Sequence, residues 1–300
     1  MNIPHIPVLY NEVLETFSEI NDGYIIDCTT GYAGHSSGLL AQNPYVKLIC
    51  NDQDDEALAF SANRLKEYES RVTFNKGNFE HVLKSFQEYK IKGILADIGV
   101  SSLQLDKEER GFGFNSEVLD MRMDQNQTLD ASFVVNTYSS VELERVFKDY
   151  GEVKEYKKLA SLIVNNRPFS SAKELSEFIA KKMHKGKLHP ATLPFQGIRI
   201  EVNDELGVLE RLFDSIESIK PKDCVVGIIS FHSLEDRIVK NYFKKWSKSC
   251  ICPSDAFRCT CGNNHALGKV ITRKPIVPTN AEIRQNPRSR SSKLRVFKFD

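Results

Sequence analysis

Two patterns of apolar and polar positions alternate along the first third of the chain. Short, β-branched apolar runs recur as GYIIDCTT, VKLICND, RVTFNKG and GILADIG. Between them, the segments HSSGLLAQ, DDEALAFSANRLKEY and FEHVLKSFQEY carry apolar residues at helical spacing. Strands that alternate with helices predict a mostly parallel sheet with helices on both faces, the doubly wound α/β arrangement.

This alternation stops after Asp97. The following stretch of roughly a hundred residues has the pattern of an irregular loop followed by helices. The helical segments include SVELERVFKDYG, KKLASLIVNN and SAKELSEFIAKKM. Strand-like apolar sequence returns at DCVVGIISFH, followed by the helix-like LEDRIVKNYFKKW and, near the end, SKLRVFKF. We therefore predict a discontinuous sheet domain, residues 1–105 and 204–300, interrupted by a helical domain at 106–203.

Composition and charge narrow the class of protein. A chain of 300 residues with 41% hydrophobic and 27% charged residues can bury a conventional core, and it has no apolar run of membrane-spanning length. The opening MNIPHIPVLYNEVLETF lacks the basic start and apolar run of a secretory signal, so we expect a cytoplasmic protein. The net charge of +1 hides a basic segment from Lys269 to Lys298, which suits either RNA binding or a solvated tail.

The stretch YIIDCTTGYAGHSSGLL places Gly31 and Gly34 in a turn between a strand and a helix. Such a turn lets the backbone approach a ligand, although it also serves as a tight connection without one. The second strand ends in Asp52, where a carboxylate can accept hydrogen bonds from both hydroxyls of a ribose. Because the turn lacks the G-x-G-x-x-G pattern of pyrophosphate binding, these features favour S-adenosylmethionine over a nicotinamide cofactor.

Two further residues lie near this predicted nucleoside site. Asp27 ends the first strand and could orient the turn, meet the amino group of the cofactor, or cap the helix. Phe79 follows the third strand and could cover an adenine or belong to the core.

The segment after the fourth strand reads ADIGVSSLQLDKEERGFGF and then LDMRMD. It resembles the RsmH (MraW) family of bacterial ribosomal RNA methyltransferases, whose members read D-x-G-V-S-S-P-Q-L-D, R-G-F-S-F and L-D-M-R-M-D. The similarity continues in HIPVLYNEV, YGE, HPAT, FQGIRIEVNDEL, ISFHSLEDRIVK and NPRSRSSKLRV, over nearly the whole chain.

The resemblance implies a class I, Rossmann-like methyltransferase that uses S-adenosyl-L-methionine, with the inserted helical domain recognising the substrate. It implies methylation of the N4 amine of a cytidine in the decoding region of 16S ribosomal RNA. The implied partner is small-subunit ribosomal RNA within the assembled small subunit, and a homodimer is left open. By motif, the cofactor contacts are Ala33, Gly34, His35, Asp52, Phe79, Asp97 and Gln104.

The sequence departs from the family pattern at several positions. Ala33 replaces a second glycine, and we expect it to leave its N–H free so that the turn changes only modestly. Leu103 replaces a proline, and TLPFQ from Thr192 replaces T-R-T-F-Q, which removes an arginine that could have touched RNA.

Methylation of an amine releases a proton, so an acceptor near the amine would help. No D-P-P-Y or N-P-P-Y motif follows the fourth strand, and DIGVSS with Asp97 is the hypothetical substitute. In SFHSLED, the structural alternative is a helix capped by Ser233. The candidate catalytic residues are Asp97, Asp120, Asp124 and His232, with His35 as a further proton acceptor.

The seven cysteines suggest no disulfide framework, and Cys28 and Cys50 lie in apolar strand segments. The stretch CICPSDAFRCTCGNNH could bind a structural zinc ion through four thiolates. Its C-x-C pairs are tighter than the usual zinc spacing, so reduced cysteines in a loop are the alternative. The candidate metal ligands are Cys250, Cys252, Cys259 and Cys261.

Three other functions compete with this interpretation. The chain could methylate a different substrate, or it could be a non-catalytic ribosomal RNA-binding assembly factor that keeps the fold. A nicotinamide dehydrogenase comes last because the pyrophosphate pattern is absent.

Overall fold

The computed structural model describes residues 7–100, 104–105, 107–183, 186, 188–253 and 256–300. Their chain divides into two compact units. The sheet unit runs up to Gly99 and resumes from Gly207 to Asp300, and the helical unit spans Val100–Leu206. Among the described residues, no helix combines the length and the apolar character needed to cross a bilayer.

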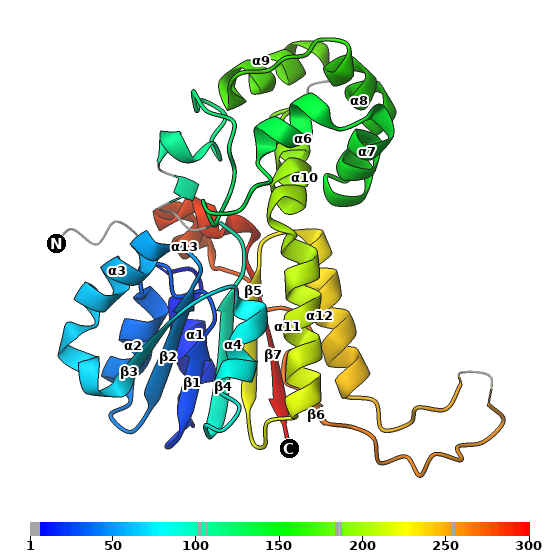
Figure 1. Ribbon diagram of the computed structural model, residues 1–300. Helices are drawn as coiled ribbons and strands as arrows, with labels where there is room; N and C mark the ends of the chain where they lie inside the picture. The colour runs from blue at the N-terminus through cyan, green and yellow to red at the C-terminus, as the bar shows by residue number, and fades with distance from the viewer. Residues whose placement is uncertain (1–6, 101–103, 106, 184–185, 187, 254–255) are drawn as a thin grey trace. The chain divides into compact units, whose positions relative to one another are not determined.

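A seven-stranded sheet in the order β3-β2-β1-β4-β5-β7-β6 forms the centre of the sheet unit (Figure 1). Strands β1 to β5 are parallel, while β7 runs antiparallel to both β5 and β6. The predicted doubly wound, mostly parallel α/β sheet is thus confirmed, whereas the short β6 was not predicted. The strands are β1 (Tyr24–Asp27), β2 (Lys47–Asp52), β3 (Val72–Lys76), β4 (Ile91–Asp97), β5 (Val225–Ser230), β6 (Gly268–Val270) and β7 (Lys293–Phe299).

Apolar side chains point to both faces of this sheet. Ile25 joins the core on one face with α1 (Tyr10–Thr16) and α2 (Gly34–Gln42). Its neighbour Ile26 joins the core on the other face with α4, α11 and α12. Because successive strand residues face opposite sides, continuous apolar runs are what a sheet covered on both faces requires. The covering helices of the second face are α4 (Phe79–Ser85), α11 (Glu205–Ile219, which enters the unit at Gly207) and α12 (Ser233–Trp246).

The strand order reverses between β1 and β4, because the chain passes from β1 to β2 on one side and β4 lies on the other. Asp27 and Asp97 end these two strands. Ligands of doubly wound sheets bind beyond the carboxyl ends of the strands at such a switch point. The fold therefore places both carboxylates where a ligand is expected.

Helices with apolar faces form the separate core of the helical unit. Gly197 in α10 packs so closely that an added Cβ would come within 2.9 Å of the Val146 carbonyl oxygen and 3.0 Å of the Gly151 nitrogen. Packing therefore explains why Gly151 in YGE and Gly197 in FQG lack a side chain. The helical segments are η2 (Glu108–Arg110), α6 (Ala131–Thr137), α7 (Ser140–Arg145), the π-helix η3 (Val146–Tyr150), α8 (Tyr156–Val164), α9 (Ala172–Lys182) and α10 (Thr192–Asn203).

The basic C-terminal segment is folded. It contains α13 (Asn280–Gln285), η4 (Pro287–Ser291) and β7. Arg295 is buried, and its Nε lies 2.6 Å from Oδ1 of Asp236 in α12. The interpretation as a solvated tail is therefore wrong for β7. The exposed basic residues of the segment are Lys269, Arg273, Lys274, Arg284, Arg288, Arg290 and Lys298.

Candidate cofactor and catalytic site

The turn after β1 is tied to the end of β2 through Asp52. The Gly31 amide donates to Oδ2 of Asp52 over 2.8 Å, and the Asp54 amide donates to Oδ1 over 3.0 Å. Gly31 has a φ of 51°, a conformation that glycine adopts without strain. Each carboxylate oxygen keeps a lone pair for another donor, so both hydroxyls of a ribose can still be accommodated.

Other residues, which sequence reasoning did not identify, hold this turn through hydrogen bonds to its carbonyl oxygens. Ser61 in α3 (Asp55–Arg64) donates to the Gly31 carbonyl over 2.7 Å, and Arg64 donates to the Tyr32 carbonyl over 2.8 Å. Asn51 is buried at the end of β2 and donates to the carbonyls of Cys28 and Gly77, 2.9 and 3.0 Å away. A buried amide inside the apolar run LICND was the available signal, because a buried polar group needs partners.

Ala33 does not have the free amide that we expected. It is fully buried in the left-handed conformation, with a φ of 54°, and its N–H donates to the Thr30 carbonyl over 2.7 Å. A non-glycine residue in this conformation costs about 1–2 kcal/mol, and the tight turn is what imposes it. The amides without an intrahelical acceptor begin with Gly34 and His35, in the first turn of α2.

Asp27 orients the turn. Its carboxylate accepts hydrogen bonds from the Ser36 hydroxyl over 2.6 Å and from the Thr29 amide over 3.3 Å. Burial raises the pKa of Asp27, and the hydrogen bond from Ser36 partly opposes that shift. The capping alternative is wrong, because Ala33 is the N-cap of α2 and no side chain caps it.

Unpaired polar atoms gather at the carboxyl ends of β4 and β5. Among the described residues, five buried side-chain nitrogen or oxygen atoms have no hydrogen-bond partner. They belong to His35 in α2, Asp97 at the end of β4, Ser230 at the end of β5, and His232. Buried polar atoms are nearly always paired, so a concentration of unpaired ones points to a polar ligand.

Asp97 and His35 are the central pair of this group. The Asp97 amide donates to the Thr29 hydroxyl over 2.7 Å, which holds the backbone of Asp97 in place. One carboxylate oxygen, Oδ2, lies 3.8 Å from Nε2 of His35, and the other, Oδ1, has no partner among the residues that the structure describes. The two side chains are close enough to contact the same ligand group. Both keep polar atoms that make no hydrogen bond to the described part of the protein.

His232 has a structural task. It is the N-cap of α12, where its Nδ1 accepts from the Glu235 amide over 3.4 Å. Glu235 completes a capping box by accepting from the His232 amide over 3.2 Å. The alternative in which Ser233 caps this helix is therefore wrong, since Ser233 is already its first residue. Nε2 of His232 lies 3.0 Å from Oε1 of Glu235, without the geometry of a hydrogen bond.

Phe79 begins α4, next to its N-cap Asn78, and is partly buried against the core of that face. Its contact with an adenine stays a prediction. Gln104 is buried in the helical unit, and its role toward the cofactor also stays a prediction. The motif residues Ser101, Ser102 and Leu103 lie outside the described residues.

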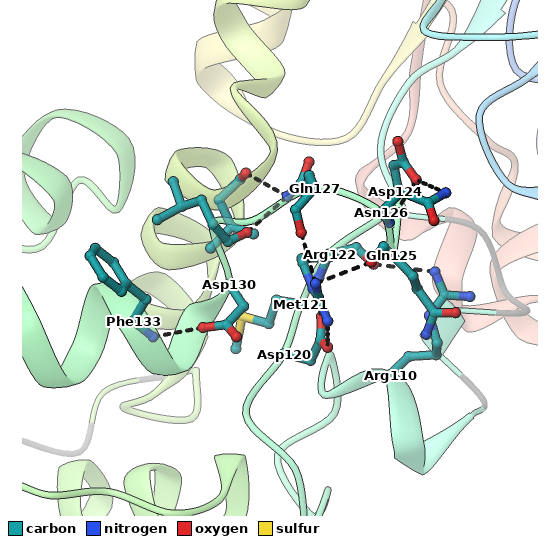
Figure 2. A network of polar contacts seen from close by, with 12 residues as sticks. Arg110, Asp120, Met121, Arg122, Asp124, Gln125, Asn126, Gln127, Asp130 and Phe133 are labelled. Carbon is teal, nitrogen blue, oxygen red and sulfur yellow. Dashed lines mark hydrogen bonds and ion pairs between the residues drawn. The ribbon is translucent and has the colours of Figure 1, made fainter.

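Figure 2 shows the LDMRMD segment of the helical unit, in which Asp120 forms a bidentate ion pair with Arg122. Arg122 donates through Nε over 2.9 Å and through a terminal nitrogen over 2.7 Å. Burial opposes ionisation of Asp120, but the hydrogen bonds from Arg122 outweigh it and lower the pKa of the carboxyl. Oδ1 of Asp124 accepts from the amide and the side chain of Asn126, both over 3.0 Å. These contacts favour a structural role for both carboxylates.

The neighbouring RGFGF motif leads to a stability prediction. Gly111 has a φ of 76°, and an added Cβ would lie 2.5 Å from the backbone nitrogen of Asp120. Gly111→Ala should therefore lower the free energy of unfolding by about 1–3 kcal/mol. Gly113 has nothing within 4 Å of an added Cβ, so Gly113→Ala is the matched control. Urea unfolding followed by circular dichroism measures both, and equal midpoints for the two variants would contradict the prediction.

The four predicted metal ligands come together in the structure. Sγ atoms of Cys250, Cys252, Cys259 and Cys261 all lie within 4.8 Å of one another. The remaining cysteines, Cys28, Cys50 and Cys224, are buried.

The chain is similar to a known protein family and to several of its members. The model of the MraW methylase family matches residues 2–300. The ribosomal RNA small subunit methyltransferase H of Aliarcobacter butzleri (strain RM4018) is 79% identical over 300 residues, covering 100% of both chains. The protein of the same name from Sulfurimonas denitrificans is 58% identical over 99% of this chain and 98% of its own. That from Campylobacter jejuni (strain RM1221) is 52% identical over 100% of this chain and 98% of its own. With the sheet order, the strand-end carboxylates and these matches together, the chain belongs to the MraW methylase family.

Proposed function

We propose that this protein is a cytoplasmic methyltransferase that transfers a methyl group from S-adenosylmethionine to the N4 amine of a cytidine in small-subunit ribosomal RNA. The observation that carries the proposal is the group of unpaired polar atoms around Asp97, next to the turn held by Asp52. The names of the relatives support the substrate class. The family resemblance supplies the N4 position.

The residues present fit the cofactor. Asp52 has lone pairs left for the ribose, and the first amides of α2 with His35 offer partners for the polar methionine end. When bound, S-adenosylmethionine supplies an electrophilic methyl group. Phe79 is proposed to lie against the adenine.

The lone pair of a cytosine amine is delocalised into the ring, so the amine is a weak nucleophile. The protein must therefore act mainly by positioning the amine against the methyl group. Holding the amine in near-attack geometry can contribute about 7–11 kcal/mol. The base must be unpaired or turned out of its stack to be reached, which single-stranded RNA makes easier. We propose the helical unit as the part that recognises this RNA.

Among the candidate proton acceptors, the contacts favour Asp97. Within the described part of the chain, Oδ1 of Asp97 has no partner, whereas Asp120 is engaged by Arg122 and His232 caps α12. A carboxylate with an open lone pair can orient the amine and accept its proton. His35, 3.8 Å away, would stabilise the charge of Asp97 when protonated.

A direct test incubates the protein with methyl-deuterated S-adenosylmethionine and small ribosomal subunits from cells that lack it. We expect labelled N4-methylcytidine, or its ribose-methylated form, by nucleoside mass spectrometry. Free 16S RNA and large subunits run in parallel identify the preferred substrate. Cofactor binding without any labelled nucleoside would instead favour a non-catalytic assembly factor, and label in another nucleoside or in protein would show a different substrate.

The ionisation of Asp52 predicts a pH dependence of cofactor binding. Burial raises the pKa of Asp52 to about 6, although the amides of Asp54 and Gly31 oppose the shift. Only the ionised carboxylate can accept from both ribose hydroxyls, so affinity should be constant above pH 7 and fall below pH 6. At pH 5 we expect about a tenfold higher Kd for S-adenosylhomocysteine than at pH 8. Calorimetric titration measures this, and Asp52→Asn should abolish the dependence.

A further inference from the structure

The loop between α12 and β6 has no core of its own. None of its described residues from Ser247 to Leu267 is buried, and Phe257 is fully exposed. The base of the loop is closed by the Leu267 amide donating to the Trp246 carbonyl over 2.8 Å and by the His265 amide donating to the Ser249 carbonyl over 2.9 Å. Apolar burial therefore does not hold these described residues of the loop in one conformation.

The Sγ atoms of four cysteines lie close together in this loop, where no buried apolar side chain among the described residues could hold it together. The Sγ atoms of Cys250 and Cys259 are 3.6 Å apart, those of Cys259 and Cys261 are 3.5 Å apart, and those of Cys261 and Cys250 are 3.7 Å apart. The Sγ of Cys252 also lies within 4.8 Å of the others. Four sulfurs at about 2.3 Å from a tetrahedral zinc ion lie about 3.8 Å from each other. The sulfur spacing therefore matches the coordination shell of one ion.

The backbone around the sulfurs is arranged to stabilise thiolates. The amide of Ile251, between the first two cysteines, donates to Sγ of Cys261 over 3.4 Å. The amide of Thr260, between the last two, donates to Sγ of Cys252 over 3.4 Å. Each tight C-x-C pair thus directs an N–H at a sulfur of the other pair. Such contacts orient metal ligands and offset their negative charge.

Other sulfur chemistry fits this arrangement less well. Contacts of 3.5–3.7 Å are far from the S–S bond length of about 2.05 Å, so no disulfide is formed. A cluster of several irons would hold its cysteines around more than one metal and spread them further than one shell.

We propose that Cys250, Cys252, Cys259 and Cys261 bind one zinc ion that orders the loop between α12 and β6. The site is structural, because the protein fills all four tetrahedral positions and leaves none for a substrate. The cysteines bind the ion as thiolates, so any of them that is a thiol releases its proton to solvent on binding.

The test uses the full chain, purified with a reductant and without a chelator, and measures metals by inductively coupled plasma mass spectrometry. We expect about one zinc per chain. Replacing Cys252 and Cys261 together by serine should lower this to below about 0.1 per chain. Cys224→Ala, which removes a buried cysteine outside the cluster, is the matched control and should keep its zinc.

Two further measurements keep the test decisive if the variant folds poorly. Wild-type protein loaded with cobalt should show thiolate-to-metal charge-transfer absorption, and zinc removal should make the loop sensitive to protease. The affinity for S-adenosylhomocysteine should change less than about twofold on removal, which separates this site from the cofactor site. Wild-type protein that has neither zinc nor a cobalt–thiolate spectrum would overturn the proposal. So would bound iron in place of zinc, or zinc content unchanged in the double variant.

Discussion

Replacing Asp97 with alanine should slow methyl transfer by about 10²- to 10⁴-fold, the range for loss of a positioned proton acceptor. The physical reason is that Oδ1 of Asp97 is buried and has no partner among the described residues, while the Asp97 amide is held by the Thr29 hydroxyl. The side chain is therefore held ready to meet a ligand group. Single-turnover assays with saturating cofactor and small ribosomal subunits measure the rate of the chemical step.

The asparagine variant separates two roles of Asp97. If the carboxylate accepts the proton, Asp97→Asn should be as slow as Asp97→Ala while the Kd for S-adenosylhomocysteine stays the same. If the carboxylate instead holds the cofactor, the Kd should rise in both variants. Asp55→Asn is a suitable control, because Asp55 lies on the surface, where it pairs with Lys76, and such pairs are worth at most about 1 kcal/mol. An Asp97→Ala variant with normal turnover would remove Asp97 from the mechanism.

Replacing Asp52 with alanine should raise the Kd for S-adenosylhomocysteine by about 10- to 150-fold. This corresponds to the roughly 1.5–3 kcal/mol of a hydrogen bond to a charged group. The variant also leaves the amides of Gly31 and Asp54 without their carboxylate acceptor, so the turn itself should loosen. Isothermal titration calorimetry gives the affinity directly.

Asp54→Ala provides the control for stability. Asp54 caps α3 by accepting from the Glu56 amide over 3.0 Å, so its loss should cost about 1 kcal/mol of folding free energy. It has no place at the ribose in this proposal, and the Kd should stay near that of the wild type. If both variants lost affinity equally, the effect would belong to the folding of the turn and not to ribose binding.

Sequence patterns were sufficient to predict the sheet, because the central strands β1, β2, β4 and β5 are largely buried and read as apolar runs. They were also sufficient to place Asp27, Asp52 and Asp97 at strand ends, since the ends of parallel strands meet at one edge. The short β6 was missed because three residues carry no periodic signal. The helix α1 was missed as well, since seven residues give little helical period.

Local sequence could not predict the hydrogen-bond partners of the individual polar groups. The free amide expected at Ala33 is used by the Thr30 carbonyl, because the turn closes on itself. His232, and not Ser233, caps α12, because the helix already begins at Ser233 and Nδ1 of His232 accepts from the Glu235 amide. Asp120 was a candidate proton acceptor by its place in LDMRMD, and the structure pairs it with Arg122, two residues further along.

The sequence by itself thus determined the class of sheet, the edge that carries the strand-end carboxylates and the family, because these depend on periodicity and on motif residues adjacent in the chain. The tertiary structure alone decided which polar atoms remain unpaired, because a hydrogen-bond partner can lie far away in sequence. The Gly31 amide and the Asp52 carboxylate, 21 positions apart, are one case. The four cysteine sulfurs are another: C-x-C spacing left a metal site and a loop of reduced cysteines both open, and the distances across the folded loop favour the metal site.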